Sequence, residues 1–184
     1  MAEAEPESMK RLHDDLHTEY TKLLDIVNGF DQRLLTVKGW GVTLSLASLG
    51  LGFQQGHYGL FLIAAVSGAA FWLLEAYVKI HQIHYYPRMR DIEVTAYELF
   101  RVDTATGPAS SPLIDWGWKT AGQRFRRQNR EGDPQVPDRY PKEMEEGRAV
   151  QPWTMAHVMF PHVVSIVVGI VLFILGLNGA FGPI

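Results

Sequence analysis

The feature that most constrains this chain is a pair of long apolar runs, joined by a very short polar turn, between Leu34 and Lys79. The first run reads LLTVKGWGVTLSLASLGLGF and contains one charged residue, and the second reads LFLIAAVSGAAFWLLEAYVK. A hydrocarbon core about 30 Å thick is crossed by about 20 apolar helical residues. Both runs reach that length, so residues 34–79 are expected to form a transmembrane helical hairpin with its turn in QQGHYG.

A third apolar run, HVMFPHVVSIVVGIVLFILGL, extends from His157 to Leu177. It is rich in β-branched residues, but a lone segment in lipid must satisfy its own backbone hydrogen bonds, which favours a helix. Pro161 is expected to mark the first turn of this helix or to kink it. Residues 155–184 are thus expected to form a third transmembrane helix and a short external tail, and the fold class is an all-α integral membrane protein.

Residues 1–33 predict an amphipathic, coiled-coil-like helix. Its apolar and aromatic positions recur at spacings of three and four residues, as in the seam of a coiled coil. They are Met9, Leu12, Leu16, Tyr20, Leu23, Val27, Phe30 and Leu34. This stripe can pair with a second copy of the chain or pack on the middle of its own chain, and the pattern supports both alternatives.

Lysine and arginine residues are confined to two segments of the chain. Residues 1–38 contain five of them and residues 79–155 contain twelve, whereas the hairpin turn and the C-terminal NGAFGPI contain none. The positive-inside rule then places the N-terminus and residues 80–154 in the cytoplasm and the C-terminus outside. The first 33 residues contain no signal-peptide core, so the first apolar run is expected to direct insertion into an inner-type membrane as a multi-pass protein.

The middle of the chain, residues 80–154, is expected to be helical at first and loop-rich later. The second apolar helix should continue to Pro87 and be followed by an amphipathic helix over residues 88–102. Residues 103–152 contain six prolines and predict loops with one short helix near residues 116–129.

Small residues line one face of each helix of the hairpin, and such residues let helices approach closely in lipid. They are Gly41, Ser45, Ser48 and Gly52 in the first helix, and Ala64 and Gly68 in the second. These faces can pack on each other within one chain, or one of them can face a neighbouring protomer or a pore.

Glu75 is the one acidic residue inside an apolar run, and it is expected at nearly the same depth as Lys38. An ionisable residue within a span indicates function by default. Both groups lie near the charged end of the hairpin, where long side chains can reach water. A Lys38–Glu75 ion pair is therefore favoured over a pore-lining or proton-carrying Glu75.

The sequence indicates neither a metal site nor an enzyme. Histidine pairs occur at helical spacing (His13 and His17, His81 and His84), but a zinc site needs three or four convergent ligands. The chain has no cysteine and lacks the GxSxG, P-loop and HExxH motifs. No cofactor is expected, and no catalysis.

A basic and aromatic stretch, GQRFRRQNR, lies in the middle segment. Its cations are Arg124, Arg126, Arg127 and Arg130, with Lys119 nearby. Arginines among aromatic residues can hold phosphates and stack on bases. The same residues can bind anionic lipid headgroups, or they can serve topology alone.

An amphipathic helix leads through RLLTVKGW into a close membrane hairpin, and the chain leaves this hairpin through LLEAYVKIHQIHYYPRMRDIE into further helix. This arrangement resembles the SLATT-type membrane effectors of bacterial nucleotide-linked conflict and anti-phage systems. The resemblance covers about residues 9–102, and the third apolar run is not part of it. It implies a homo-oligomer of the bacterial inner membrane, for instance a tetramer, that opens or disrupts the membrane when a partner enzyme supplies a nucleotide or oligonucleotide. The charge of Arg124–Arg130 makes this stretch the expected ligand site.

The expected function is accordingly a gated pore or membrane-disrupting effector, in which a ligand shifts the population between two packings of the hairpin. A second hypothesis is a non-catalytic membrane anchor or scaffold that recruits a cytoplasmic partner. A third is a small membrane enzyme or transporter that uses Glu75 and the interfacial histidines.

Overall fold

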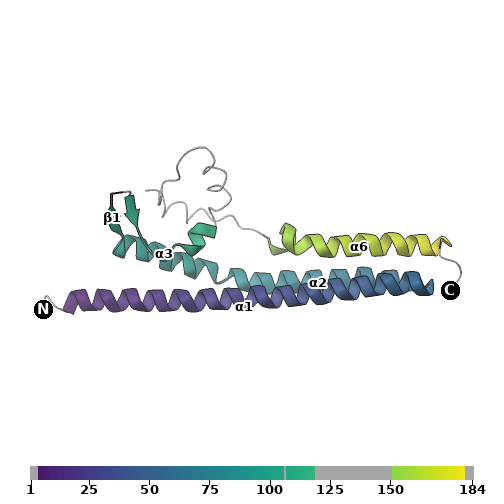
Figure 1. Ribbon diagram of the computed structural model, residues 1–184, viewed down its shortest axis with the longest axis horizontal. Coiled ribbons are helices and arrows are strands. Elements are labelled where there is room, and N and C mark those ends of the chain that lie inside the picture. The colour runs from purple at the N-terminus through teal and green to yellow at the C-terminus, as the bar shows by residue number, and fades with distance from the viewer. Residues whose placement is uncertain (1–3, 106, 119–150, 181–184) are drawn as a thin grey trace. The chain divides into compact units, whose positions relative to one another are not determined.

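The computed structural model describes residues 4–105, 107–118 and 151–180, and this part of the chain is mostly helical (Figure 1). Its helices and strands, in chain order, are α1 (Ala4–Gln55), α2 (Gly59–Ile83), α3 (Tyr86–Phe100), β1 (Val102–Thr104), β2 (Gly107–Ala109), the 3-10 helix η1 (Pro152–Thr154) and α6 (Ala156–Leu177). Residues 114–118 are also helical.

Three of these helices, α1, α2 and α6, are long and apolar enough to cross a membrane. The prediction of three apolar helices of this length is confirmed. The helix is not interrupted at the predicted boundary between residues 33 and 34, because α1 is a single helix of 52 residues. Gly29 lies inside it. A glycine in a helix costs only about 1 kcal/mol relative to alanine, which packing on either side of it readily offsets.

The described residues fall into two compact units. The three-helix unit comprises Asn28–Gln82 and residues 151–180. The α3 unit comprises the residues up to Val27 and those from Ile83 to residue 118. Helix α1 contributes to both units.

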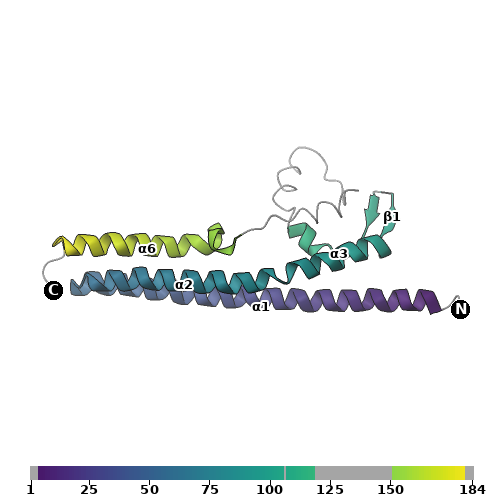
Figure 2. The same cartoon turned by 180° about the vertical axis from the view of Figure 1, so that it is seen from behind.

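The core of the α3 unit joins the first half of α1 to α3. Leu16, Tyr20 and Val27 of α1 pack against Met89 and Ile92 of α3, and all five are buried. The central part of the amphipathic stripe thus packs on its own chain, which is one of the two alternatives that its periodicity left open. Figure 2 shows α3 running beside α1, with β1 next to the last turn of α3.

Two local features differ from the predictions. Helix α2 ends at Ile83, and α3 begins at Tyr86. Pro87 therefore lies in the first turn of α3, where no backbone hydrogen bond is lost, because the N–H groups of a first turn have no helical acceptor. The segment expected to be loop after α3 contains an antiparallel β-hairpin in which Val102 pairs with Ala109 and Thr104 with Gly107. The all-α expectation is therefore wrong at this point.

The three-helix unit is an up-down-up arrangement in which α2 lies beside the second half of α1 and α6 lies beside α2 (Figure 1). The turn from α1 to α2 passes through Gly56, whose φ of 70° favours glycine. At that end of the unit Gly176 of α6 meets Tyr58, and nearer the middle Gly169 meets Phe61 and Ala65. Helix α6 is therefore antiparallel to α2 and parallel to α1.

Candidate polar site in the three-helix unit

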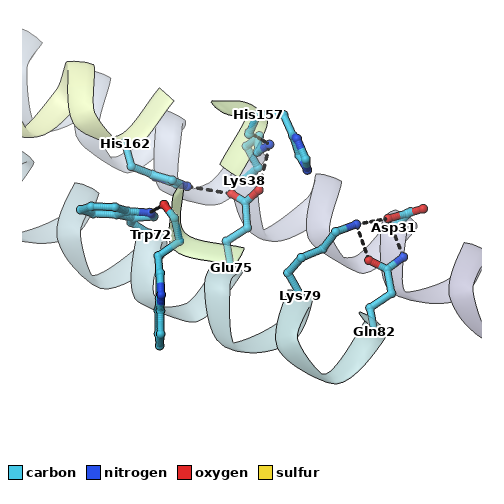
Figure 3. Close-up of polar contacts among 9 residues, drawn as sticks. Asp31, Lys38, Trp72, Glu75, Lys79, Gln82, His157 and His162 are labelled. Carbon is cyan, nitrogen blue, oxygen red and sulfur yellow. Dashed lines mark hydrogen bonds and ion pairs between the residues drawn. The ribbon is translucent and has the colours of Figure 1, made fainter. Parts of the chain in front are cut away.

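The centre of the candidate site is the carboxylate of Glu75 on α2, which is 1% exposed. Lys38 of α1 lies 2.9 Å from its Oε1 atom, and Nε2 of His162 on α6 lies 2.8 Å from its Oε2 atom (Figure 3). The Lys38–Glu75 ion pair predicted from the sequence is present. The third member, His162, was missed as a partner of Glu75. One carboxylate thus joins all three helices of the unit.

Pro161 explains a further contact of Lys38. Proline has no N–H, so within α6 the carbonyl group four residues earlier, that of His157, receives no hydrogen bond from residue 161. The Lys38 ammonium donates to this carbonyl oxygen at 2.7 Å. The proline therefore supplies a second acceptor for the lysine and helps to hold α6 against α1.

A second polar cluster lies next to the first. The Lys79 ammonium lies 2.5 Å from Oε1 of Gln82 and 3.5 Å from Oδ1 of Asp31, and Gln82 Nε2 donates to the same Asp31 oxygen at 2.8 Å (Figure 3). The spacing of the residues produces both clusters. Lys79 follows Glu75 by one helical turn and Asp31 precedes Lys38 by two, so antiparallel helices bring the pairs together in order.

A cavity of about 190 Å³ opens beside the two clusters. It is lined by four charged residues, Asp31, Lys38, Glu75 and Lys79, and by Leu34, Leu35, His157 and Val158. The lysine side chains are mostly covered, with exposed fractions of 24% for Lys38 and 12% for Lys79. The site is therefore a partly enclosed, charged recess between apolar helices.

The small residues predicted to line a packing face or a pore make contacts within the chain. A Cβ atom on Gly41 would come within 2.8 Å of Phe71, and one on Gly52 within 2.5 Å of Phe61. Ser45 donates a 3.4 Å hydrogen bond to the carbonyl of Ala64. Ser48 and Ala64 are buried.

Gly68 was grouped with these residues but faces the third helix instead. A Cβ atom there would lie 3.2 Å from Ser165 and Ile166 of α6. The reciprocal glycines on α6 were missed: a Cβ on Gly169 would come within 2.6 Å of the Phe61 carbonyl oxygen, and one on Gly176 within 2.1 Å of Tyr58. Their seven-residue spacing was the signal that could have found them.

A different face of α1 bears a second series of small residues. Gly39, Thr43, Ala47 and Gly50 recur at spacings of four, four and three residues, and all four are exposed. Among the residues that the structure describes, a Cβ atom on Gly39 or Gly50 would meet no atom within 4 Å beyond its chain neighbours and the nearby backbone of α1. This face, called the open α1 face below, therefore remains available for close contact with another helix.

The α3 unit contains its own buried carboxylate, Glu93. It accepts hydrogen bonds from the Tyr20 hydroxyl at 2.5 Å and from the backbone N–H groups of Asp115 and Trp116 at 2.6 and 3.1 Å. Those N–H groups belong to the first turn of the helical residues 114–118, where such donors lack helical partners. Burial raises the pKa of Glu93, and burial together with the hydrogen bond to Glu93 raises the pKa of the Tyr20 phenol.

An exposed ion pair also links α1 and α3. Arg88 donates two parallel hydrogen bonds to Glu19, from Nε at 2.8 Å and from Nη2 at 2.7 Å. These bonds hold the pKa of Glu19 below its usual value and that of Arg88 above it. Their bidentate geometry fixes orientation more than it adds stability, because both side chains are about half exposed.

The predicted ligand cations Lys119, Arg124, Arg126, Arg127 and Arg130 lie outside the described residues. Among the residues that are described, no group of three or more histidine, aspartate or glutamate side chains is placed to hold a metal ion. The chemistry open to the described part of the site is thus that of a buried carboxylate with an ammonium and an imidazole.

Comparison with protein-family models, with curated proteins and with solved structures found no significant match to this chain. The resemblance to SLATT-type effectors accordingly stays a prediction.

Proposed function

We propose that this chain is a homo-oligomeric pore-forming or channel effector of the bacterial inner membrane, without catalysis of its own. The observation that carries the proposal is the Lys38–Glu75–His162 network between three apolar helices, in which Glu75 and His162 are buried. Ionisable residues within membrane-crossing helices are costly, and they commonly mark ion paths or proton relays. An anchor would need none of them.

The network supports a gate because Glu75 has partners on both neighbouring helices. Its two oxygen atoms bind Lys38 on α1 and His162 on α6, so a movement of α2 against either helix must break one contact. In this proposal the network has two discrete states, with that contact formed or broken, as a gate requires. In this proposal the described arrangement is the closed state.

The open α1 face supports self-association. In lipid, helices associate through small residues that permit close backbone contact. Gly39 and Gly50 have open space around them, whereas Gly41 and Gly52 are already covered by α2. A second copy would therefore pack on the open α1 face.

The proposed trigger is a nucleotide or oligonucleotide, which follows from the resemblance and from the charge of Arg124–Arg130. Anionic lipid is the other ligand that this charge fits. Helix α1 runs through both units without interruption, so it is the element through which a ligand on the middle segment would act on the three-helix unit.

The test is to purify the full chain in mild detergent, measure the mass of the complex, and record ion flux from liposomes. Gly39→Leu and Gly50→Leu place side chains on the open α1 face and are expected to reduce oligomerisation and flux. Val66→Leu, at an exposed position of α2, is the matched control and should change neither. A wild-type monomer that passes no ions, with or without nucleotides, refutes the proposal.

A membrane anchor or scaffold is the second candidate, and one observation favours it. Gly41, Ser45 and Gly52, which a pore model would place along a pore, pack against α2 of the same chain. An anchor should keep its activity when α1 and α2 of the three-helix unit are replaced by an unrelated helical hairpin, whereas a pore should not.

A further inference from the structure

The charged cavity of the three-helix unit has features that the pore proposal does not use. Lys38 and Lys79 line it, and so do Asp31 and Glu75. The formal charge of this lining is zero, from two ammonium groups and two carboxylates, with His157 counted as neutral. A ligand that brings a net charge of either sign would leave charge uncompensated in a partly enclosed site, which is unfavourable.

Both lysines keep a hydrogen-bond donor for a ligand. An ammonium group has three N–H donors. Among the described residues, Lys38 contacts two acceptors, Glu75 Oε1 and the His157 carbonyl, and Lys79 contacts Gln82 and Asp31. A phosphate oxygen could therefore bind both lysines without displacing their carboxylate partners.

The carboxylates keep acceptor capacity in the same way. Each carboxylate has about four lone-pair sites, and the contacts described for Asp31 and Glu75 use only part of them. The cavity thus offers donors to an anion and acceptors to a cation a few ångströms apart.

Apart from His157, the remaining walls of the cavity are apolar. Leu34 and Leu35 line it beside the charged residues, and Leu35 is 69% exposed. Lys38 lies near the start of the first apolar run and Lys79 ends the second. If the three helices span a membrane, this is the depth at which headgroups replace acyl chains.

We propose that the cavity binds the headgroup of a zwitterionic phospholipid with a primary amine, that is, a phosphoethanolamine headgroup. Its phosphate binds Lys38 and Lys79, its ammonium binds Asp31 and Glu75, and an acyl chain lies along Leu35. The choline headgroup has no N–H to donate to the carboxylates. The glycerol headgroup of an anionic phospholipid leaves the phosphate charge without its cation.

The test is native mass spectrometry of the full chain, titrated in detergent with phosphatidylethanolamine, phosphatidylcholine and phosphatidylglycerol of the same acyl chains. Phosphatidylethanolamine is expected to bind at least about tenfold more tightly than the other two, the factor that one charge-assisted hydrogen bond gives. Tighter binding of phosphatidylglycerol, equal binding of all three lipids, or no binding overturns the proposal.

Variants assign the binding to the cavity. Lys79→Gln is expected to weaken phosphatidylethanolamine binding about tenfold. Asp31→Asn removes a half-exposed carboxylate that contacts Lys79 and Gln82, and it should shift the preference toward phosphatidylglycerol. Lys22→Gln, at an exposed position of the α3 unit, is the matched control. An Asp31→Asn variant that keeps the wild-type lipid preference, with unchanged thermal stability, contradicts the assignment.

Soluble glycerophosphoethanolamine separates a lipid from a free zwitterion. It should compete poorly, because it lacks the acyl chain that contacts Leu35, and competition at lipid-like concentrations would overturn the lipid assignment. Ion flux is not a readout in these experiments, so their outcome is independent of the pore proposal.

Discussion

Replacing Glu75 by leucine should destabilise the three-helix unit more than the loss of its direct contacts alone implies. The substitution leaves Lys38 with the His157 carbonyl as its described acceptor, and it removes the carboxylate partner of His162, which is 1% exposed. The cost lies in the polar groups that remain buried without the carboxylate.

The magnitude follows from how deeply these groups are covered. Removing one partner of a fully buried ion pair costs about 3–5 kcal/mol. Lys38 is 24% exposed and can reach water through its flexible stem, so about 2–3 kcal/mol is expected here. The double variant Lys38→Met with Glu75→Leu removes the unpaired ammonium and should recover part of the loss, because apolar replacement of a whole pair is often neutral. It leaves His162 without its carboxylate partner, so the recovery is incomplete.

The assay is equilibrium unfolding in mixed micelles titrated with sodium dodecyl sulfate and followed by tryptophan fluorescence. Trp72 is a suitable reporter, because it lies three residues before Glu75 on α2 and its indole donates a hydrogen bond to the carbonyl of Trp153. Glu75→Gln, which retains hydrogen-bonding capacity, should fall between wild type and Glu75→Leu. The reasoning is refuted if Glu75→Leu costs less than about 0.5 kcal/mol, the range of ordinary surface substitutions. It is equally refuted if the double variant is as unstable as the sum of the single variants.

Three further outcomes are expected. Gly176→Leu should detach α6 from the hairpin, because a Cβ atom there already comes within 2.1 Å of Tyr58, and cysteine cross-linking between α2 and α6 should detect the loss. Burial raises the pKa of Glu93 above its usual 4.5, so the stability that its proton provides is fully present below pH 4.5 and is lost as the pH rises through the folded-state pKa. Glu93→Gln should therefore flatten the pH dependence of unfolding in that window, as measured by urea titration at several pH values. Arg88→Gln should cost at most about 1 kcal/mol in the same titration, because its bond to Glu19 is exposed.

The long helices could be predicted because their length and periodicity are local properties of the sequence. Residues 156–177 form α6, within one residue of the apolar run identified from the sequence. The β-hairpin that follows α3 could not be predicted in this way, since strands of three residues carry almost no periodic signal. The helix break before Tyr86 was placed too late because a proline fits the first turn of a helix as well as its end.

Contacts in the candidate site could be predicted only between residues at equal distances from the turn of the α1–α2 hairpin. Lys38 and Glu75 lie at similar distances from the turn at Gly56, so their pairing follows from an antiparallel hairpin. The partnership with His162 depends on the register of α6 against α2, and the long segment between these helices leaves that register undetermined. Pro161 was a usable signal, because a proline inside a helix frees the carbonyl of His157.

Variants of the Glu75 network can distinguish two ways in which a pore could open. A pore that forms within one chain must separate α2 from α1 or α6 and so break the contacts of Glu75, at the cost of about 2–3 kcal/mol estimated above. A ligand that moves such an equilibrium from 1:99 to 99:1 must supply about 5.5 kcal/mol of differential binding.

Glu75→Gln weakens the closed state, so it should raise flux in the absence of any nucleotide if the pore is intramolecular. A pore that forms between protomers on the open α1 face leaves the network intact. Glu75→Gln should then leave the basal flux unchanged, while Gly39→Leu abolishes the flux that a nucleotide triggers. Basal flux of Glu75→Gln and nucleotide-triggered flux of Gly39→Leu, measured at equal protein-to-lipid ratio, distinguish the two mechanisms, and wild-type values of both refute each of them.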